Sequence, residues 1–219
     1  RIPHNPSTLP LHYSSPDNYE MVSGYKKTIV LEEEDLDKRI FLRFDGVAHI
    51  ATLYFNGKEI GTHYSGYTSF TYEVTKYIKK GDNEIILKVD SRESSNIPPF
   101  GFVIDYLTYS GIYRDVFLIK KNKSYIKDVF VSTSTLSSLT TEYEVDSHKE
   151  YSIEYEILDG DRVIEKGETR EKTFTLSSLS VSPWSPSSPK LYLLKSKLMI
   201  DGECYDENTT EFGFRTVEA

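Results

Sequence analysis

The stretch Tyr151-Ser152-Ile153-Glu154-Tyr155-Glu156-Ile157 alternates apolar and polar side chains without interruption. Successive side chains of a β-strand point to opposite faces, so this period of two predicts a strand with one buried face. The same alternation recurs over residues 40–44 and 85–89, and no stretch has the periodicity of a long amphipathic helix. These patterns predict an all-β protein.

Turn signals separate the predicted strands. Asn56-Gly57 lies between two β-rich runs and predicts a tight hairpin, because this pair tolerates the positive φ angles of a type I′ turn. Gly81-Asp82-Asn83 and Asp159-Gly160 are interpreted as further turns. Short strands at this spacing favour β-sandwiches or barrels.

A polar segment, Lys120-Lys121-Asn122-Lys123-Ser124, interrupts two apolar strands and predicts a domain boundary. The first predicted domain is 1–122. The second is 123–219, close to the ~100 residues of an immunoglobulin-like sandwich. Within it, residues 182–189 are rich in Pro and Ser and predict an irregular connection, since proline cannot serve a central strand.

Composition narrows the class of protein. The net charge of −8 disfavours nucleic acid and anionic membrane surfaces as partners. No apolar run is long enough for a transmembrane helix. Cys204 is the single cysteine and cannot form an internal disulfide, which weakly favours the cytoplasm. Because the sequence opens at Arg1 without a methionine, secretion stays open as well.

The residues themselves show no catalytic constellation. No histidine pairs with another at helical spacing or with a second cysteine, so no metal site is predicted. Phosphate-binding glycine loops and the Gly-x-Ser-x-Gly nucleophile elbow do not occur. Cys204 is interpreted as an incidental residue in a turn. A binding or supporting role is therefore favoured over a complete enzyme.

Four segments, in order along the chain, resemble glycoside hydrolase family 2. Residues 41–61, which contain Arg43-Phe44-Asp45-Gly46-Val47 and Phe55-Asn56-Gly57, resemble the core of that family's sugar-binding domain. Residues 65–83, with Ser65-Gly66-Tyr67, are similar to its next conserved stretch. Gly111-Ile112-Tyr113-Arg114 resembles the signature that closes the domain. Residues 184–192 and 212–215 resemble the end of its immunoglobulin-like domain.

The resemblance implies a galactose-binding-like jelly-roll sandwich followed by an immunoglobulin-like sandwich. In the family, the segment matching Phe212-Gly213-Phe214-Arg215 leads into a catalytic (β/α)₈ barrel. This chain is therefore expected to be the non-catalytic N-terminal part of a retaining glycosidase, most similar to β-galactosidases, with the catalytic glutamates on the missing barrel and no catalytic residue of its own. The fragment alone is expected to be inactive.

Two carboxylates are candidate substrate-binding residues by this resemblance. Asp105 lies five positions before Ser110, the spacing at which galactosidases of the family place an aspartate that reaches the active site. The resemblance implies that Asp105 accepts a hydrogen bond from a sugar hydroxyl. Glu20 stands near the position of a second family contact, usually an asparagine. A solvent-facing role for Glu20 is an equal alternative.

Other residues of these segments are interpreted as structural. Arg114 is expected to be buried within the sandwich, with Asp115 beside it, because a planar guanidinium suits several hydrogen bonds. Trp184, the single tryptophan, is expected to be a packing anchor rather than a sugar-stacking platform.

Alternatives remain open at this level. A β-glucuronidase-like member of the family would carry a similar aspartate, and an autonomous carbohydrate-binding module would share the fold. The expected partners are a β-galactoside and the chain's own catalytic barrel, and a homo-oligomer stays open. Family members bind sodium or magnesium mainly through the barrel, so no cofactor is assigned to this chain.

Overall fold

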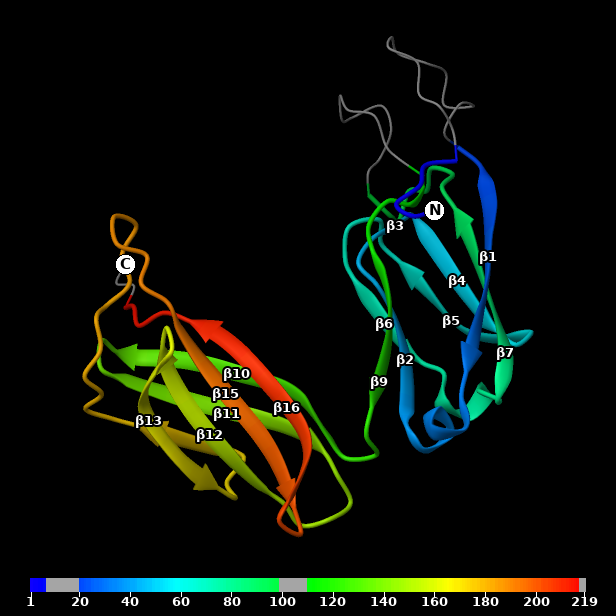
Figure 1. Cartoon of the computed structure of the whole chain (residues 1–219). Helices are drawn as coiled ribbons and strands as arrows, with labels where there is room; N and C mark the ends of the chain where they lie inside the picture. The colour runs from blue at the N-terminus through cyan, green and yellow to red at the C-terminus, as the bar shows by residue number, and fades with distance from the viewer. Residues whose placement is uncertain (7–19, 99–109, 217–219) are drawn as a thin grey trace. The chain divides into compact units, whose positions relative to one another are not determined.

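The computed structural model describes residues 1–6, 20–98 and 110–216. These residues form β-strands and two short 3-10 helices, Glu33–Asp37 and Thr75–Tyr77. No helix among them is long and apolar enough to cross a membrane. The chain divides into two compact units, Arg1–Lys120 and Lys121–Ala219 (Figure 1). The expected all-β class is confirmed.

The first unit is a sandwich of two main sheets (Figure 1). Its strands are β1 (Val22–Leu31), β2 (Arg39–Phe44), β3 (Val47–Ala48), β4 (Ile50–Phe55), β5 (Lys58–Tyr64), β6 (Phe70–Glu73), β7 (Gly81–Asp90), β8 (Gly111–Ile112) and β9 (Val116–Lys121). One sheet has the order β1-β7-β4-β5, and the other has the order β6-β2-β9. The short strands β3 and β8 form a separate pair.

The predicted alternation builds the core of this unit. In β2, Ile40, Leu42 and Phe44 are buried, while Arg43 between them is exposed. The apolar side chains of β4 and β7 join the same cluster from the opposite sheet. Removing this apolar surface from water provides the main stabilisation of the sandwich, at roughly 25 cal/mol per Å².

The predicted hairpin at Asn56-Gly57 is confirmed. β4 and β5 pair in antiparallel fashion around it, and both turn residues have positive φ, 47° and 75°. Both angles belong to a type I′ turn, whose twist matches that of the flanking strands. Here the local sequence was sufficient to predict the structure.

The segment Gly81-Asp82-Asn83 is the start of strand β7, so its interpretation as a turn was wrong in part. Only Gly81 has the positive φ of a turn residue, 81°. Asn83 is fully buried, and its Oδ1 accepts hydrogen bonds from the Lys79 main-chain N–H (3.0 Å) and from Asn56 Nδ2 (2.8 Å). Its Nδ2 donates to the carbonyl oxygens of Lys79 (2.7 Å) and Gly81 (2.9 Å). The buried Asn83 side chain thus holds the main chain of residues 79–81 in the loop that precedes β7.

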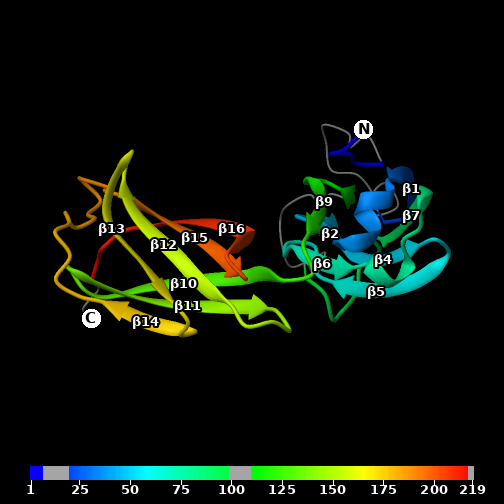
Figure 2. The ribbon, with the colours of Figure 1, turned by 60° about the horizontal axis from the view of Figure 1, so that its bottom comes forward.

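The second unit is an immunoglobulin-like sandwich (Figure 2). Its strands are β10 (Tyr125–Thr135), β11 (Ser138–Asp146), β12 (Ser152–Asp159), β13 (Arg162–Thr169), β14 (Thr173–Leu176), β15 (Tyr192–Ile200) and β16 (Glu203–Phe212). The sheet β10-β11-β14 faces the sheet β13-β12-β15-β16. Ile153, Tyr155 and Ile157 are buried in the core between them, as the alternation predicted.

Thr141 in β11 has a defect that a single substitution can test. Its side chain is fully buried, and its Oγ1 has no hydrogen-bond partner among the described residues. An unsatisfied buried hydroxyl costs about 1–3 kcal/mol. We expect Thr141→Val, which keeps the shape, to raise the free energy of unfolding by about 1 kcal/mol. Urea denaturation followed by the fluorescence of Trp184, which lies in the same unit, measures this change.

The neighbouring Thr140 provides the matched control. Its hydroxyl forms a hydrogen bond with Thr175 Oγ1 at 2.9 Å, so Thr140→Val removes an interaction instead of a defect. Thr140→Val should leave stability unchanged or lower it. Equal effects of the two substitutions would contradict the account of Thr141.

Candidate functional site

One end of the first unit gathers segments that are far apart in sequence. The short strands β3 and β8 pair there, with Val47 opposite Ile112 and Ala48 opposite Gly111. The next residue, His49, donates its main-chain N–H to the carbonyl oxygen of Asp90, at the end of β7 (3.2 Å). These bonds connect the ends of strands from different parts of the chain into one surface.

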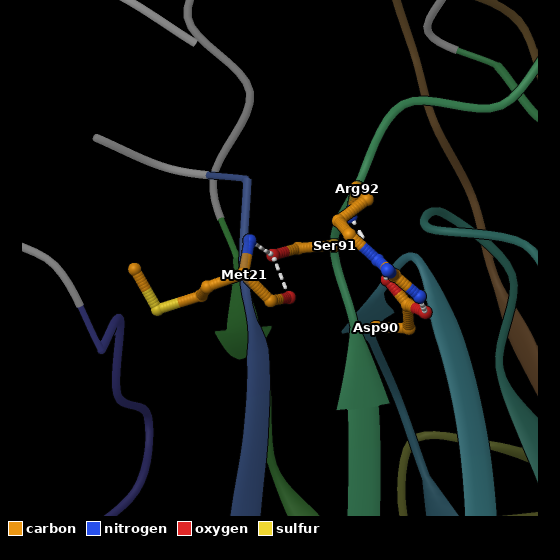
Figure 3. A network of polar contacts seen from close by, with 4 residues as sticks. All are labelled: Met21, Asp90, Ser91 and Arg92. Carbon is orange, nitrogen blue, oxygen red and sulfur yellow. Dashed lines mark hydrogen bonds and ion pairs between the residues drawn. The ribbon is translucent and has the colours of Figure 1, made fainter. Parts of the chain in front are cut away.

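Ser91 ties the end of β7 to the residue that precedes β1 (Figure 3). Its Oγ accepts a hydrogen bond from the Met21 main-chain N–H (3.2 Å) and donates one to the Met21 carbonyl oxygen (2.9 Å). The Ser91 main-chain N–H donates to the same carbonyl at 2.9 Å. Ser91 is buried, so the main chain beside Glu20 is held in place.

Asp90 and Arg92 form a two-pronged ion pair beside this clamp (Figure 3). Arg92 Nε donates to Asp90 Oδ1 at 2.9 Å, and Nη2 donates to Oδ2 at 2.5 Å. These hydrogen bonds are the main reason that the pKa of Asp90 lies below its ordinary value. Asp90 therefore remains ionised and fixes the plane of the guanidinium.

His49 lies beneath the surface of this end and is buried. A Cβ at residue 66 would lie 3.1 Å from His49 Cδ2, so Gly66 allows the ring to approach the main chain. Burial lowers the pKa of His49, and the negative charge of Asp90 opposes that shift in part. The imidazole is therefore neutral near pH 7, because its ordinary pKa is already about 6.5.

Tyr113 connects three of the glycine-containing segments. Its hydroxyl donates a hydrogen bond to the carbonyl oxygen of Gly66. A Cβ at residue 46 would lie 2.7 Å from Tyr113 Cζ, so the ring packs directly on Gly46. The glycines of these segments thus serve close packing of aromatic rings against main chain.

Ser110 fixes the point at which β8 begins. It is 1% exposed, and its Oγ donates to Asn5 Oδ1 at 3.0 Å. The main-chain N–H of Ser110 approaches the same oxygen at 3.4 Å. Nearby, the main-chain N–H of His4 donates a hydrogen bond to the carbonyl oxygen of Ile112 (2.7 Å).

The structure places one of the two candidate carboxylates. Glu20 is partly buried and directly precedes Met21, the residue clamped by Ser91. The pKa of Arg92 is raised chiefly by its hydrogen bonds with Asp90, and the charge of Glu20 adds to this effect. Asp105, the other candidate, lies outside the described residues.

Arg114 differs from its expected position. It is exposed, and its guanidinium carbon lies 5.6 Å from the centre of the Tyr113 ring. The expectation of a buried guanidinium was therefore wrong, because Tyr113 rather than Arg114 takes the inner position. Asp115 is also exposed, and its carbonyl oxygen accepts a hydrogen bond from the Asp45 main-chain N–H (3.0 Å).

Trp184 and Cys204 lie in the second unit. Trp184 packs against Gly213, where a Cβ would lie 3.1 Å from the Trp184 Cβ, and its main-chain N–H donates to the Phe214 carbonyl (2.8 Å). These contacts agree with a packing anchor. Cys204 belongs to β16 instead of the preceding turn, and partial burial is the main reason that its thiol pKa is raised. A raised pKa lowers the thiolate fraction and hence its nucleophilicity.

Sequence reasoning missed His49, Asp90, Ser91 and Arg92. The available signal was the polar triplet Asp90-Ser91-Arg92, which directly follows the alternating residues 85–89. Strand ends in β-sandwiches carry the loops in which binding residues gather.

The chemistry available at this end is hydrogen bonding by charged groups. Glu20 and Asp90 supply carboxylate acceptors, and Arg92 supplies guanidinium donors. Charged donors and acceptors of this kind suit ligands rich in hydroxyl groups. Across the described part of the chain, no three His, Cys, Asp or Glu residues gather as metal ligands.

The fold defines a protein of two β-sandwiches in tandem, with polar side chains gathered at one end of the first, and comparisons with known proteins give the family. Residues 5–122 match the model described as "Glycosyl hydrolases family 2, sugar binding domain", and residues 124–215 match "Glycosyl hydrolases family 2". The chain belongs to glycosyl hydrolase family 2.

The relatives are named after two different activities, β-galactosidase and β-glucuronidase. The chain is 34% identical to a β-galactosidase of Thermoanaerobacter pseudethanolicus, over 99% of this chain and 31% of that protein. It is 40% identical to a β-glucuronidase of Bacteroides fragilis, over 45% of this chain and 14% of that protein. A β-glycosidase structure from Bacteroides vulgatus matches with a TM-score of 0.82 and 25% identity, over 99% of this chain and 30% of that chain.

The chain spans about a third of the length of the curated β-galactosidases that it matches, 31% and 32% in two cases. Both of these relatives are named β-galactosidases.

Proposed function

We propose that this chain forms the sugar-binding and immunoglobulin-like domains of a retaining β-galactosidase and lends a substrate-binding carboxylate to an active site on a catalytic barrel. In such an enzyme, two glutamates about 5–5.5 Å apart act as nucleophile and acid/base. Two β-galactosidases matched over nearly the whole chain support this substrate class.

Asp105 is the proposed carboxylate. The observation that carries the proposal is the anchoring of Ser110, five residues later, by Asn5 and by the β3–β8 pair that follows it. This anchor starts the closing strand at the end of the domain where His49 meets Asp90. Asp105 is assigned to hold a sugar hydroxyl, not to transfer a proton.

Glu20 is the second proposed contact. Its main chain is held by the Met21–Ser91 hydrogen bonds, and Arg92 lies near enough for its charge to interact with that of Glu20. A carboxylate beside a fixed main chain and near a guanidinium held by Asp90 can accept hydrogen bonds from, and the guanidinium can donate them to, neighbouring hydroxyls of one sugar.

The test is Asp105→Ala in the full-length protein. A hydrogen bond to a charged acceptor contributes about 1.5–3 kcal/mol, so we expect kcat/KM on a chromogenic β-galactoside to fall by about 10- to 100-fold. Asp115→Ala is the control, because Asp115 is an exposed carboxylate ten residues further along the chain. Undiminished activity of Asp105→Ala would refute the assigned role.

Two alternatives, a β-glucuronidase and an autonomous carbohydrate-binding module, can be tested by the choice of ligand. The match to a β-glucuronidase favours testing glucuronides beside galactosides in the same assay, and preference for the glucuronide would replace the proposed sugar. Calorimetric titration of this chain alone with galactose, glucuronate and mannose oligosaccharides tests for an autonomous binding module. Sub-millimolar binding would favour the module, and we expect no binding, because the proposed site needs the barrel.

A further inference from the structure

An apolar groove of about 520 Å³ opens between the two sheets of the first unit. Strands β1 and β9 are edges of their sheets, and the groove lies where residues of these two edges face each other. Its apolar walls include Ile29, Ile85 and Leu87 from one sheet and Leu42, Val116 and Leu118 from the other. Its volume lies within the range of roughly 300–1,000 Å³ typical of small-molecule sites.

Part of this inner surface is in contact with water. Tyr25, Ile29, Ile85 and Val116 pack against the core but are only partly buried, and Leu118 is 37% exposed. Apolar surface left in water forgoes about 25 cal/mol per Å², so covering the groove would be favourable.

Lys27 is the unusual residue in this wall. It pairs with Ile85, and the pairs two positions away along the strand are Tyr25 with Leu87 and Ile29 with Asn83. Directly opposed residues share one face of a sheet, and Leu87 is 1% exposed in the core. Lys27 therefore lies on the inner face, and no described residue forms a hydrogen bond or ion pair with its ammonium group.

The charges around the groove have one sign. Arg1, Lys26 and Lys27 line it, and no carboxylate does so among the described residues. Lys26 is ion-paired with Glu84, whereas Arg1 and Lys27 have no ion pair among the described residues. Of these two, only Lys27 belongs to a strand of the sandwich. This basic lining is notable in a chain with a net charge of −8, and it is complementary to an anionic ligand.

We propose that the groove binds a small anionic amphiphile of the fatty-acid class, with its alkyl chain between the sheets and its carboxylate on Lys27. The apolar walls would take the chain by burial, and the ammonium would take the head group as a charge-assisted hydrogen bond. The groove shares His4 and Ile112 with the β3–β8 end of the unit, but it is not lined by Met21, Asp90, Ser91 or Arg92. The proposal does not depend on the proposed glycosidase function.

Dodecanoate is the probe, and calorimetric titration of the full 219-residue chain is the measurement. We expect one site per chain. Dodecanol and dodecyltrimethylammonium serve as neutral and cationic analogues. Both should bind at least about tenfold more weakly than dodecanoate, because neither carries a negative charge to form an ion pair with the ammonium group.

Lys27→Met tests the head-group contact, since it removes the charge and keeps an unbranched side chain. We expect this variant to bind dodecanoate about tenfold more weakly and dodecanol as before. Lys88→Met is the matched control, because Lys88 is an exposed lysine of the neighbouring strand β7. It should leave dodecanoate binding unchanged. Thermal unfolding of each variant establishes that the fold is intact.

Three results would overturn the proposal. The first is no dodecanoate binding, which is also the result expected if a second copy of the chain covers the groove. The second is equal binding of dodecanoate and its cationic analogue. The third is unchanged binding by folded Lys27→Met, which would leave Lys27 as an edge-strand charge that discourages sheet-to-sheet pairing.

Discussion

Asn83→Leu is expected to lower the free energy of unfolding of the first unit by about 3–5 kcal/mol. The substitution keeps the approximate shape of a fully buried side chain and removes its four hydrogen bonds. Main-chain groups of Lys79 and Gly81 and the amide of Asn56 lose a buried partner, at about 1–3 kcal/mol each before relaxation.

Urea denaturation followed by far-UV circular dichroism measures this loss. Trp184 lies in the second unit, so a transition seen by circular dichroism and not by tryptophan fluorescence belongs to the first unit. Asp82→Leu is the control, because Asp82 is an exposed neighbour in the same strand. A loss below about 1 kcal/mol for Asn83→Leu would show that water replaces the lost bonds.

Gly111→Ala is expected to cost about 2–4 kcal/mol and to disturb the β3–β8 pair. Gly111 has φ of 90°, which an L-residue adopts only with strain of about 1–3 kcal/mol. A Cβ would also lie 2.2 Å from the Tyr25 hydroxyl and 2.7 Å from the His4 carbonyl oxygen, which adds overpacking of a similar size. The same denaturation assay reports the change.

Gly24→Ala is the matched control for that substitution. Gly24 lies in β1, its φ is not positive, and no atom lies within 4 Å of a Cβ built there. Replacing it should leave stability unchanged or raise it by up to about 1 kcal/mol, because alanine restricts the unfolded chain. Similar losses at both glycines would contradict a special requirement at Gly111.

Both expected results concern residues in the segments that resemble the family. Asn83 and Gly111 belong to segments that resemble the family, yet both serve the fold: one closes a loop, and the other admits a close main-chain contact. A residue can therefore be part of a family's sequence signature because it stabilises the fold, without belonging to the active site. The side chain of Arg92 at the strand end is 62% exposed and hence accessible to a ligand, whereas Asn83 is fully buried.

The strands and one hairpin could be predicted because their signals are local. A period of two requires only that one face be buried, as at Ile153, Tyr155 and Ile157. Asn56-Gly57 suits positive φ by itself. The family resemblance then supplied the order of the two sandwiches, which no local pattern contains.

The arrangement of the candidate site could not be predicted from such signals. Met21 and Ser91 are seventy positions apart, and only the antiparallel pairing of β1 with β7 brings them into contact. The same holds for His49, whose neighbour Asp90 is set by the pairing of β4 with β7. The predicted burial of Arg114 was wrong, because the burial of a side chain depends on which of its neighbours takes the inner position, here Tyr113.

The sequence by itself determined the all-β class, the alternating cores, the Asn56-Gly57 turn and the family to which the chain belongs. Only the tertiary structure decided that Asn83 is a buried hub, that Lys27 faces inward along an open edge, and that Ser91 and Arg92 stand beside Glu20. The physical reason is the distance along the chain over which each effect acts. Backbone preference and alternation act between neighbours in sequence, whereas burial and hydrogen-bond partners are set by which strands lie side by side.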